Sequence, residues 1–221
     1  MTAFNQRIGV AADAVIFTVD HGELKALLIQ MKKTPFSGRW AMPGGLIENK
    51  ETTRQAAERI LKIQTGVKDV YLEQLQTFDD LKRDPNGRVL SVAYMALVPS
   101  GNIKLKTNDR YSDVRWWSIK KLPTLAYDHS EILKIAINRL RSKLEYTNIV
   151  WSLLPPEFTL TQLQNIYEII LDRDLDKRNF RRKILELGLV ATTGKKIKGE
   201  AYRPAELYRF KQRRLTYVEV I

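Results

Sequence analysis

The stretch from residue 38 to residue 67 constrains the fold of this chain more than any other part of its sequence. Trp40 and Pro43-Gly44-Gly45 predict a strand that ends in a glycine loop. Beyond the loop, apolar residues recur with helical spacing over 52–64, and Gly66 follows as a stop signal. The stretch therefore predicts a strand, a loop and an amphipathic helix in immediate succession.

This stretch resembles the Nudix box, a pattern of Gly, five residues, Glu, seven residues, then Arg-Glu-apolar-x-Glu-Glu-x-Gly-apolar. Six positions agree with it at fixed spacing: Gly45, Glu51, Arg59, Leu61, Gly66 and Val67. Trp40 and Pro43-Gly44-Gly45, which precede the box, are also typical of the family. The resemblance implies a Nudix fold of the α+β class, an α/β/α sandwich with a mixed sheet.

The departures from the box concern its chemistry. Where the family has metal-binding and catalytic glutamates, this chain has Ile60, Ile63 and Gln64. Nudix hydrolysis of a diphosphate uses several carboxylates on one helical face to hold Mg²⁺ and prepare a water. Isoleucine cannot ligate a hard cation and glutamine offers a neutral oxygen, so we expect neither efficient hydrolysis nor a required cofactor. Weak Mg²⁺ binding stays open through the remaining glutamates Glu48, Glu51 and Glu58.

The resemblance also implies a pocket for a nucleoside-diphosphate type of ligand over the loop Gly44-Gly45. Four basic residues are candidate phosphate contacts: Lys32, Arg39, Arg83 and Arg88. Trp40 and Phe78 are candidates for stacking on a base, although Trp40 is also a good core residue. Residues 83–94 resemble a segment that recurs in Nudix-type regulators, which makes its two arginines the stronger candidates.

Strand and helix patterns continue over the first two-thirds of the chain. Strands are predicted at 10–19 and 24–31, joined by a turn at Asp20-His21-Gly22-Glu23, and again at 71–78, 89–98 and 114–119. A long helix is predicted from about Ser130 to Leu144. Within Tyr127-Asp128-His129 a catalytic base is one interpretation. We favour the other, in which Asp128 forms a capping box with Glu131.

Composition limits the classes of protein to which the chain can belong. Without cysteine it has no disulfide, thiolate metal site or cysteine nucleophile. It has no apolar run long enough for a membrane span and no signal peptide at its start, so we expect a cytoplasmic protein. The net charge is +12, and 13 basic against 4 acidic residues from Lys177 onwards place +9 on the last 45 residues. This imbalance indicates a polyanionic partner.

The basic C-terminal region has the pattern of a winged helix-turn-helix. A first helix begins near Thr159 or Thr161, and a second covers 177–187, with Asp176 as its cap and Gly188 as its stop. Phe180, Ile184 and Leu187 recur on one face of the second helix, which turns its basic residues away from the core. Strands at 189–192 and 206–210 then enclose a basic hairpin, as a wing would. The candidate DNA contacts are Lys177, Arg178, Asn179, Arg181, Arg182, Lys195, Lys196 and Lys198.

A Nudix domain over 1–148 followed by a winged helix over 149–221 resembles the Nudix-related transcriptional regulators of bacteria. These are best known as ADP-ribose-responsive repressors of NAD synthesis, with relatives that respond to sugars. The resemblance implies a homodimer on a palindromic double-stranded operator, with an effector such as ADP-ribose, a sugar or a sugar phosphate in the Nudix pocket. The join over 146–157 is apolar and ends in Pro155-Pro156, so we expect it to dock as a rigid segment.

Three alternatives stay open at this point. The first is an active Nudix hydrolase of the ADP-ribose pyrophosphatase type with an accessory basic domain, which the missing glutamates disfavour. The second is a Nudix protein that binds RNA, because phosphate contacts alone do not separate DNA from RNA. In the third, the C-terminal region is a helical tail that supports dimerisation.

Overall fold

The structure is a computed structural model that describes residues 8–66, 71–101, 103, 105, 107, 109–197 and 204–218. Val67 of the box and Lys198 of the predicted wing lie outside these residues. The described residues form two compact units, and the division falls inside one helix, between Ile137 and Asn138. The second unit also takes up residues 18–24 and 97–101. No helix in the described ranges is long and apolar enough to cross a membrane.

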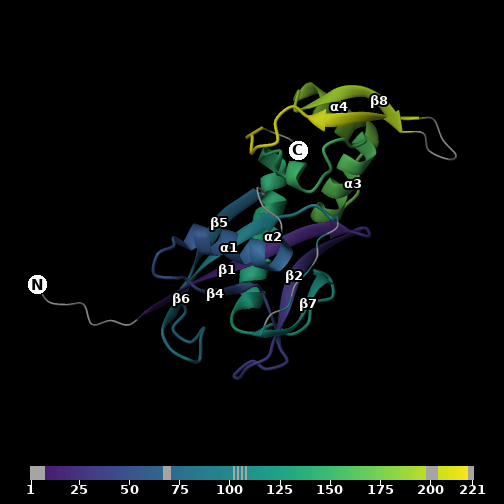
Figure 1. Cartoon of the computed structure of the whole chain (residues 1–221). Helices are drawn as coiled ribbons and strands as arrows, with labels where there is room; N and C mark the ends of the chain where they lie inside the picture. Colours follow the sequence, from purple (N-terminus) through teal and green to yellow (C-terminus); the bar gives the residue numbers. More distant parts are fainter. Residues whose placement is uncertain are drawn as a thin grey trace, which may run out of the picture. The chain divides into compact units, whose positions relative to one another are not determined.

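A seven-stranded sheet forms the centre of the N-terminal region (Figure 1). Its strand order is β3-β2-β1-β6-β5, with β4 paired to β1 and β7 paired to β2. The strands are β1 (Gly9–Asp20), β2 (Glu23–Met31), β3 (Trp40–Ala41), β4 (Gly44–Leu46), β5 (Tyr71–Phe78), β6 (Val89–Leu97) and β7 (Tyr111–Ser118). The strands predicted from period and composition are confirmed. The strand predicted at Trp40 is the short β3, whereas β4 begins inside the glycine loop, where the sequence pattern indicated no strand.

The long strands β1 and β2 are joined at the predicted turn. His21 and Gly22 both have positive φ, at 49° and 74°, which is the conformation of a tight two-residue hairpin. The central residues of both strands are buried, from Ala11 to Thr18 in β1 and from Ala26 to Ile29 in β2. Because both faces of these strands are buried, their sequences are apolar runs that do not alternate between apolar and polar residues.

Helix α1 (Thr53–Thr65) follows the loop after β4, and its ends agree with the sequence signals. Thr52 accepts a hydrogen bond from the Gln55 backbone while the Gln55 side chain returns to the Thr52 backbone, which is a capping box. Gly66 ends the helix with φ of 71°, in the left-handed region that favours glycine. Figure 1 shows α1 crossing one face of the sheet. The helix turns a buried apolar side inward, which holds the box against the sheet.

Helix α2 (His129–Tyr146) begins where a helix was predicted, but the proposed capping box at its start is wrong. The backbone carbonyl of Asp128 accepts from the backbone N–H groups of Glu131 and Ile132, at 2.9 and 3.2 Å. The Asp128 carboxylate instead receives two hydrogen bonds from Arg83, each 2.8 Å long. Two bonds from a cationic guanidinium are stronger than one bond from a backbone N–H, so Arg83 holds the carboxylate away from the helix end.

The C-terminal unit contains the winged-helix elements η1 (Ile149–Ser152), α3 (Leu160–Leu171), α4 (Lys177–Glu186), β8 (Val190–Ile197) and β9 (Ala205–Phe210). Thr159 caps α3 through a capping box with Gln162, and Asp176 caps α4 by accepting from Asn179, as predicted. Strands β8 and β9 form a two-stranded antiparallel sheet (Figure 1). Both strands are longer than the sequence pattern indicated, because the solvated wing residues lack an apolar alternation.

The join before α3 is packed, as its composition predicted. Ile149 and Val150 are fully buried, and Leu153 and Leu154 are nearly so. Arg213 donates hydrogen bonds to the carbonyls of Trp151, Leu154 and Pro155, which ties the segment to the end of the chain. The join is therefore an integral part of the C-terminal unit.

Candidate functional site

The N-terminal unit has a cavity of about 440 Å³ between β1, β2 and the loops that follow β3, β5 and β7. This volume lies in the usual range of small-molecule sites. Apolar residues, mostly from the strands, line part of it. Its polar and aromatic lining consists of Asp13, Lys33, Gly44, Gly45, Arg83, Asp84, Arg110, Tyr111, Tyr127 and His129.

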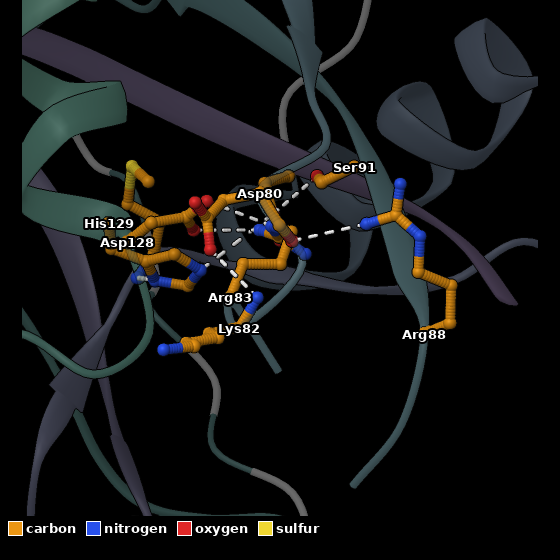
Figure 2. Close-up of polar contacts among 9 residues, drawn as sticks. Asp80, Lys82, Arg83, Arg88, Ser91, Asp128 and His129 are labelled. Carbon is orange, nitrogen blue, oxygen red and sulfur yellow. Dashed lines mark hydrogen bonds and ion pairs between the residues drawn. The ribbon is translucent and has the colours of Figure 1, made fainter. Parts of the chain in front are cut away.

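A buried polar cluster, part of which Figure 2 shows, contributes Asp13, Arg83 and His129 to the cavity lining. The Asp13 carboxylate accepts from the Ser91 hydroxyl at 2.5 Å and from Arg83 at 3.3 Å. His129 Nε2 lies 3.7 Å from the same Asp13 oxygen, and His129 Nδ1 accepts the backbone N–H of Met42 at 2.9 Å. Arg83 completes the cluster by binding Asp128. These contacts connect strand β1, the β5–β6 loop, strand β6 and the start of α2.

Polar and charged neighbours offset the effect of burial on Asp13 and Arg83. Burial alone would raise the pKa of Asp13, but its polar neighbours His129, Ser91 and Arg83 lower it below the usual value. Burial likewise acts to lower the pKa of Arg83, and Asp128 and Asp13 more than offset this effect. A buried arginine between two carboxylates has its charge balanced inside the protein.

The Nudix helix α1 and the loop before it pair the glutamates Glu48 and Glu51 with Arg59. Arg59 donates to both oxygens of Glu51, at 2.6 and 2.9 Å, and lies 3.7 Å from Glu48. The bond from Arg59 is the largest cause that lowers the pKa of Glu51 to about 2. Ile60 and Gln64 are buried, and the Gln64 Oε1 atom has no partner among the described residues. Within the described ranges, no group of three or more His, Cys, Asp or Glu side chains is arranged to hold a metal ion.

Helix α4 presents a charged outer face in the C-terminal unit. Phe180 and Ile184 are buried and Leu187 is partly buried, so the predicted inner face is confirmed. Lys177, Arg178, Asn179 and Arg182 are exposed. Arg182 donates to Asn179 at 3.2 Å along the same face.

Arg181 differs from the other arginines of α4. Its guanidinium donates to the Thr161 hydroxyl on α3 at 2.9 Å, and the side chain is only partly exposed. Its Nε atom is buried without a hydrogen-bond partner in the part of the chain that the structure describes. Arg181 thus joins α4 to α3.

The wing carries two described lysines on strand β8. Lys195 donates to the Glu157 carboxylate at 2.8 Å, a contact that links the wing to the residue before Phe158. Lys196 is exposed. Gly194, with φ of 74°, marks the irregularity in the β8–β9 register between Thr192 and Lys196. The wing therefore has a basic surface, part of which is paired within the protein.

Two domain models match this chain, the NUDIX domain over residues 7–136 and the NrtR DNA-binding winged helix domain over residues 150–210. An ADPR responsive transcriptional repressor of Acinetobacter baylyi is 43% identical over 209 residues, which is 91% of this chain and 81% of that protein. The chain belongs to the NrtR family.

Solved structures of the NrtR family agree with both regions. The crystal structure of Shewanella oneidensis NrtR with a 27mer DNA has 35% identity and a TM-score of 0.81, covering 91% of this chain and 93% of the other. The NUDIX domain of the same NrtR, solved with ADP ribose, has 35% identity and a TM-score of 0.55, covering 61% of this chain and 90% of that one. The Nudix fold and the winged helix are thereby confirmed.

The eight predicted ligand residues fall into two groups in this NrtR-family structure. Gly44, Gly45 and Arg83 line the cavity. The remaining five, Lys32, Arg39, Trp40, Phe78 and Arg88, are not among its lining residues.

Each of the five has another environment. Lys32 and Arg39 are exposed, and Arg88 donates to the carbonyls of Asp79 and Asp80 at 2.7 and 3.2 Å. Trp40 is buried edge-on against Trp117, with ring centroids 5.1 Å apart, and Phe78 is buried in β5.

Several residues of the cavity and of the polar cluster beside it were missed by sequence reasoning. The lining residue Asp13 and its partner Ser91 lie inside apolar strands, where a single polar residue gives no spacing signal. Tyr127 and His129 were noticed together, and the positive φ of Tyr127, 53°, is an unusual conformation for a tyrosine. The Tyr127 ring lies 4.4 Å from Phe36 and 5.1 Å from His129, measured between centroids. Only the fold brings these residues to one wall.

Proposed function

We propose that this protein is a bacterial transcriptional repressor whose winged helix binds operator DNA and whose Nudix cavity binds ADP-ribose. The observation that carries the proposal is the 43% identity to an ADPR responsive transcriptional repressor over both regions of the chain. The exposed basic face of α4 and the cavity of about 440 Å³ supply the two surfaces that such a protein needs. The chain works where the DNA of a bacterium lies, in the cytoplasm.

We further propose that the Nudix region is not an enzyme. Hydrolysis of a diphosphate would need carboxylates at positions that Ile60, Ile63 and Gln64 occupy. The carboxylate of Glu51 is held by Arg59, which leaves it poorly placed for Mg²⁺. Any Mg²⁺ affinity would be weak. We also propose that the domain boundary lies between residues 148 and 149. The protein would bind a palindromic operator as a homodimer.

The proposed DNA contacts are the α4 face and the wing. Side chains on the first turns of α4, such as Arg178 and Asn179, would reach base edges, while wing lysines would contact phosphates. Lys177, Arg182, Lys195 and Lys196 extend the same basic surface. Lys198 belongs to the prediction but lies outside the described residues. Arg181 would act through its bond to Thr161, by positioning α4.

Fluorescence anisotropy on the duplex beside the protein's own gene tests the proposal, with a scrambled duplex as control and ADP-ribose as titrant. We expect tighter binding to the native duplex and a change in that affinity when ADP-ribose is added. Equal binding to both duplexes, or no effect of ADP-ribose, would contradict it.

A parallel chromatographic assay with Mg²⁺ or Mn²⁺ follows ADP-ribose itself. Turnover of roughly 1 s⁻¹ or faster would establish an active hydrolase instead, because that rate is at the low end of ordinary enzymes.

A further inference from the structure

The segment that follows β3 is joined to the start of α2 by a buried hydrogen bond. The Met42 backbone N–H donates to His129 Nδ1 at 2.9 Å, and Met42 and His129 are 1% and 4% exposed. Both residues line the cavity. Two further contacts join the same segments, because the Ala126 N–H donates to the Trp40 carbonyl at 2.7 Å and Trp40 forms a parallel bridge with Leu125. A displacement of the segment after β3 therefore acts on the first residue of α2.

The imidazole of His129 can hold Met42 in only one protonation state. A backbone N–H is a donor alone, so Nδ1 must act as the acceptor and carry no proton. The single proton of the neutral ring is then on Nε2, the atom that lies 3.7 Å from the Asp13 carboxylate. A second proton would turn Nδ1 into a donor, and two donors would face each other across 2.9 Å. Protonation of His129 therefore breaks the bond to Met42.

Charged and titratable groups from several elements surround this ring. The Asp13 carboxylate on β1 is bound by Arg83 from the β5–β6 loop, and Arg83 also binds Asp128 just before α2 (Figure 2). The Tyr127 ring lies 5.1 Å from the imidazole, measured between centroids. The other titratable groups that line the cavity are Lys33, Asp84, Arg110 and Tyr111. The ring is thereby placed between the Met42 amide on one side and the Asp13 cluster on the other.

Helix α2 extends from His129 into the second compact unit. It is a single unbroken helix, and the division between the two units falls inside it. In the second unit, Arg141 Nε donates to the Ile170 carbonyl of α3 at 2.9 Å. Helix α3 is in turn bonded to α4 through Thr161 and Arg181. One continuous helix therefore connects the lining of the cavity with the helices of the winged region.

We propose that His129 is a positioning residue that couples the cavity to α2. A ligand that displaces the segment 42–45 would move the Met42 amide, and the bond at Nδ1 would pass this displacement to the first residue of α2. Because the bond is buried, water cannot replace either partner, and an unpaired amide would be costly. This inference rests on the proposed function, since it assumes that ADP-ribose in the cavity changes operator affinity. It adds the residue and the atom through which that change passes.

Nitrogen NMR of the imidazole rings tests the hydrogen bond itself. The chain has two histidines, so the His21→Gln variant assigns both sets of signals. At about pH 7.5 we expect a neutral His129 ring with its proton on Nε2 and none on Nδ1. Hydrogen exchange of the Met42 amide should be faster in His129→Gln than in the parent. A proton on Nδ1 would overturn the proposal.

Two variants of the full chain separate the two ring nitrogens. His129→Asn keeps an acceptor at the position of Nδ1, whereas His129→Gln keeps a polar group near Nε2 and loses that acceptor. Anisotropy gives, for each variant, the factor by which saturating ADP-ribose changes operator affinity. We expect His129→Asn to keep this factor within about twofold of the parent and His129→Gln to lower it about fivefold, as the loss of one buried hydrogen bond allows. Ser130→Ala, an exposed change at the next position of α2, is the matched control and should behave like the parent.

A pH series provides a readout that a purely structural role would not change. Imidazole gains its second proton between about pH 8 and pH 5, so the factor of the parent should fall across this range as Nδ1 ceases to be an acceptor. His129→Asn has no such proton, so its factor should stay constant. If melting curves show that His129→Gln does not fold, the comparison of the parent with His129→Asn decides.

The outcomes separate this coupling from the proposed function. If ADP-ribose changes operator affinity by the same factor in the parent and in both His129 variants, the coupling through His129 is wrong while the proposed function stands. Equal losses in His129→Asn and His129→Gln would also overturn it, because the acceptor would then not matter. If ADP-ribose has no effect on operator affinity in the parent, the proposed function is wrong and the coupling fails with it.

Discussion

At the scale of single residues, Gly44 and Asp13 show how closely the loop approaches the wall of the cavity. A Cβ at position 44 would lie 1.9 Å from Asp13 Oδ1 and 3.2 Å from the Ala12 carbonyl. Asp13 is held in place by Ser91 and Arg83, so it cannot move aside without breaking those bonds. The glycine is required by this close approach.

We therefore expect Gly44→Ala to lower the free energy of unfolding by about 1–3 kcal/mol, as overpacking does. Gly45→Ala is the matched control, because a Cβ there meets no atom within 4 Å and its change should stay within about 1 kcal/mol. Urea unfolding of the two variants measures both values. Equal stability of the two variants would show that Asp13 can shift to make room for a Cβ at position 44.

The Glu51–Arg59 pair predicts a particular dependence on pH. The folded pKa of Glu51 is about 2, against an ordinary value of 4.5, so the folded state binds the proton less readily than the unfolded state. The pair therefore stabilises the protein above pH 4.5, and this contribution is lost as the pH falls through 2. Parent and Glu51→Gln should differ most in urea stability near pH 6 and progressively less towards pH 3. A difference that does not shrink would contradict the assignment.

At the scale of elements, helix α4 combines the proposed DNA contacts with attachment to α3. Arg178 is exposed, whereas Arg181 is bonded to Thr161. Arg178→Ala should therefore cost about 1–3 kcal/mol in operator binding and leave stability within about 0.5 kcal/mol. Arg181→Ala should weaken operator binding and also lower the free energy of unfolding by about 1 kcal/mol. Urea melts and anisotropy on both variants check this. An Arg181→Ala protein that is as stable as the parent would make Arg181 a DNA contact alone.

The wing offers a second prediction, because Glu157 holds Lys195 at 2.8 Å. Glu157→Gln removes a negative charge and releases the lysine, so binding to all DNA sequences should tighten by a few-fold, the size of an exposed ion pair. Glu131→Gln, an exposed change on α2, is the control for net charge. Anisotropy across salt concentrations measures both. Unchanged or weaker binding by Glu157→Gln would exclude competition between Glu157 and DNA.

At the scale of the whole molecule, the effector and the operator must be linked reciprocally. If ADP-ribose changes the operator affinity by some factor, the operator changes the ADP-ribose affinity by the same factor, commonly about 5- to 150-fold. Anisotropy at saturating ADP-ribose gives the first factor, and calorimetry in the presence of operator DNA gives the second. Unequal factors would mean that ADP-ribose also acts through another equilibrium, such as assembly.

Local signals in the sequence were sufficient to predict several elements of the molecule. The helix α1 and its Gly66 stop, the caps Thr159 and Asp176, and the buried face of α4 all result from periodicity and capping chemistry within one turn or two. The Nudix box and its departures at Ile60, Ile63 and Gln64 are also readable from fixed spacing.

The residues that surround the cavity, in contrast, are selected by tertiary contacts. Asp13, Ser91 and His129 meet because three distant segments converge, and Arg83 claims Asp128 from the helix end for the same reason. Lys33 lines the cavity and its neighbour Lys32 does not, a difference that local sequence does not indicate. Burial and long-range charge pairing have no period along the chain, so the wall of the site could be assigned only after the chain had folded.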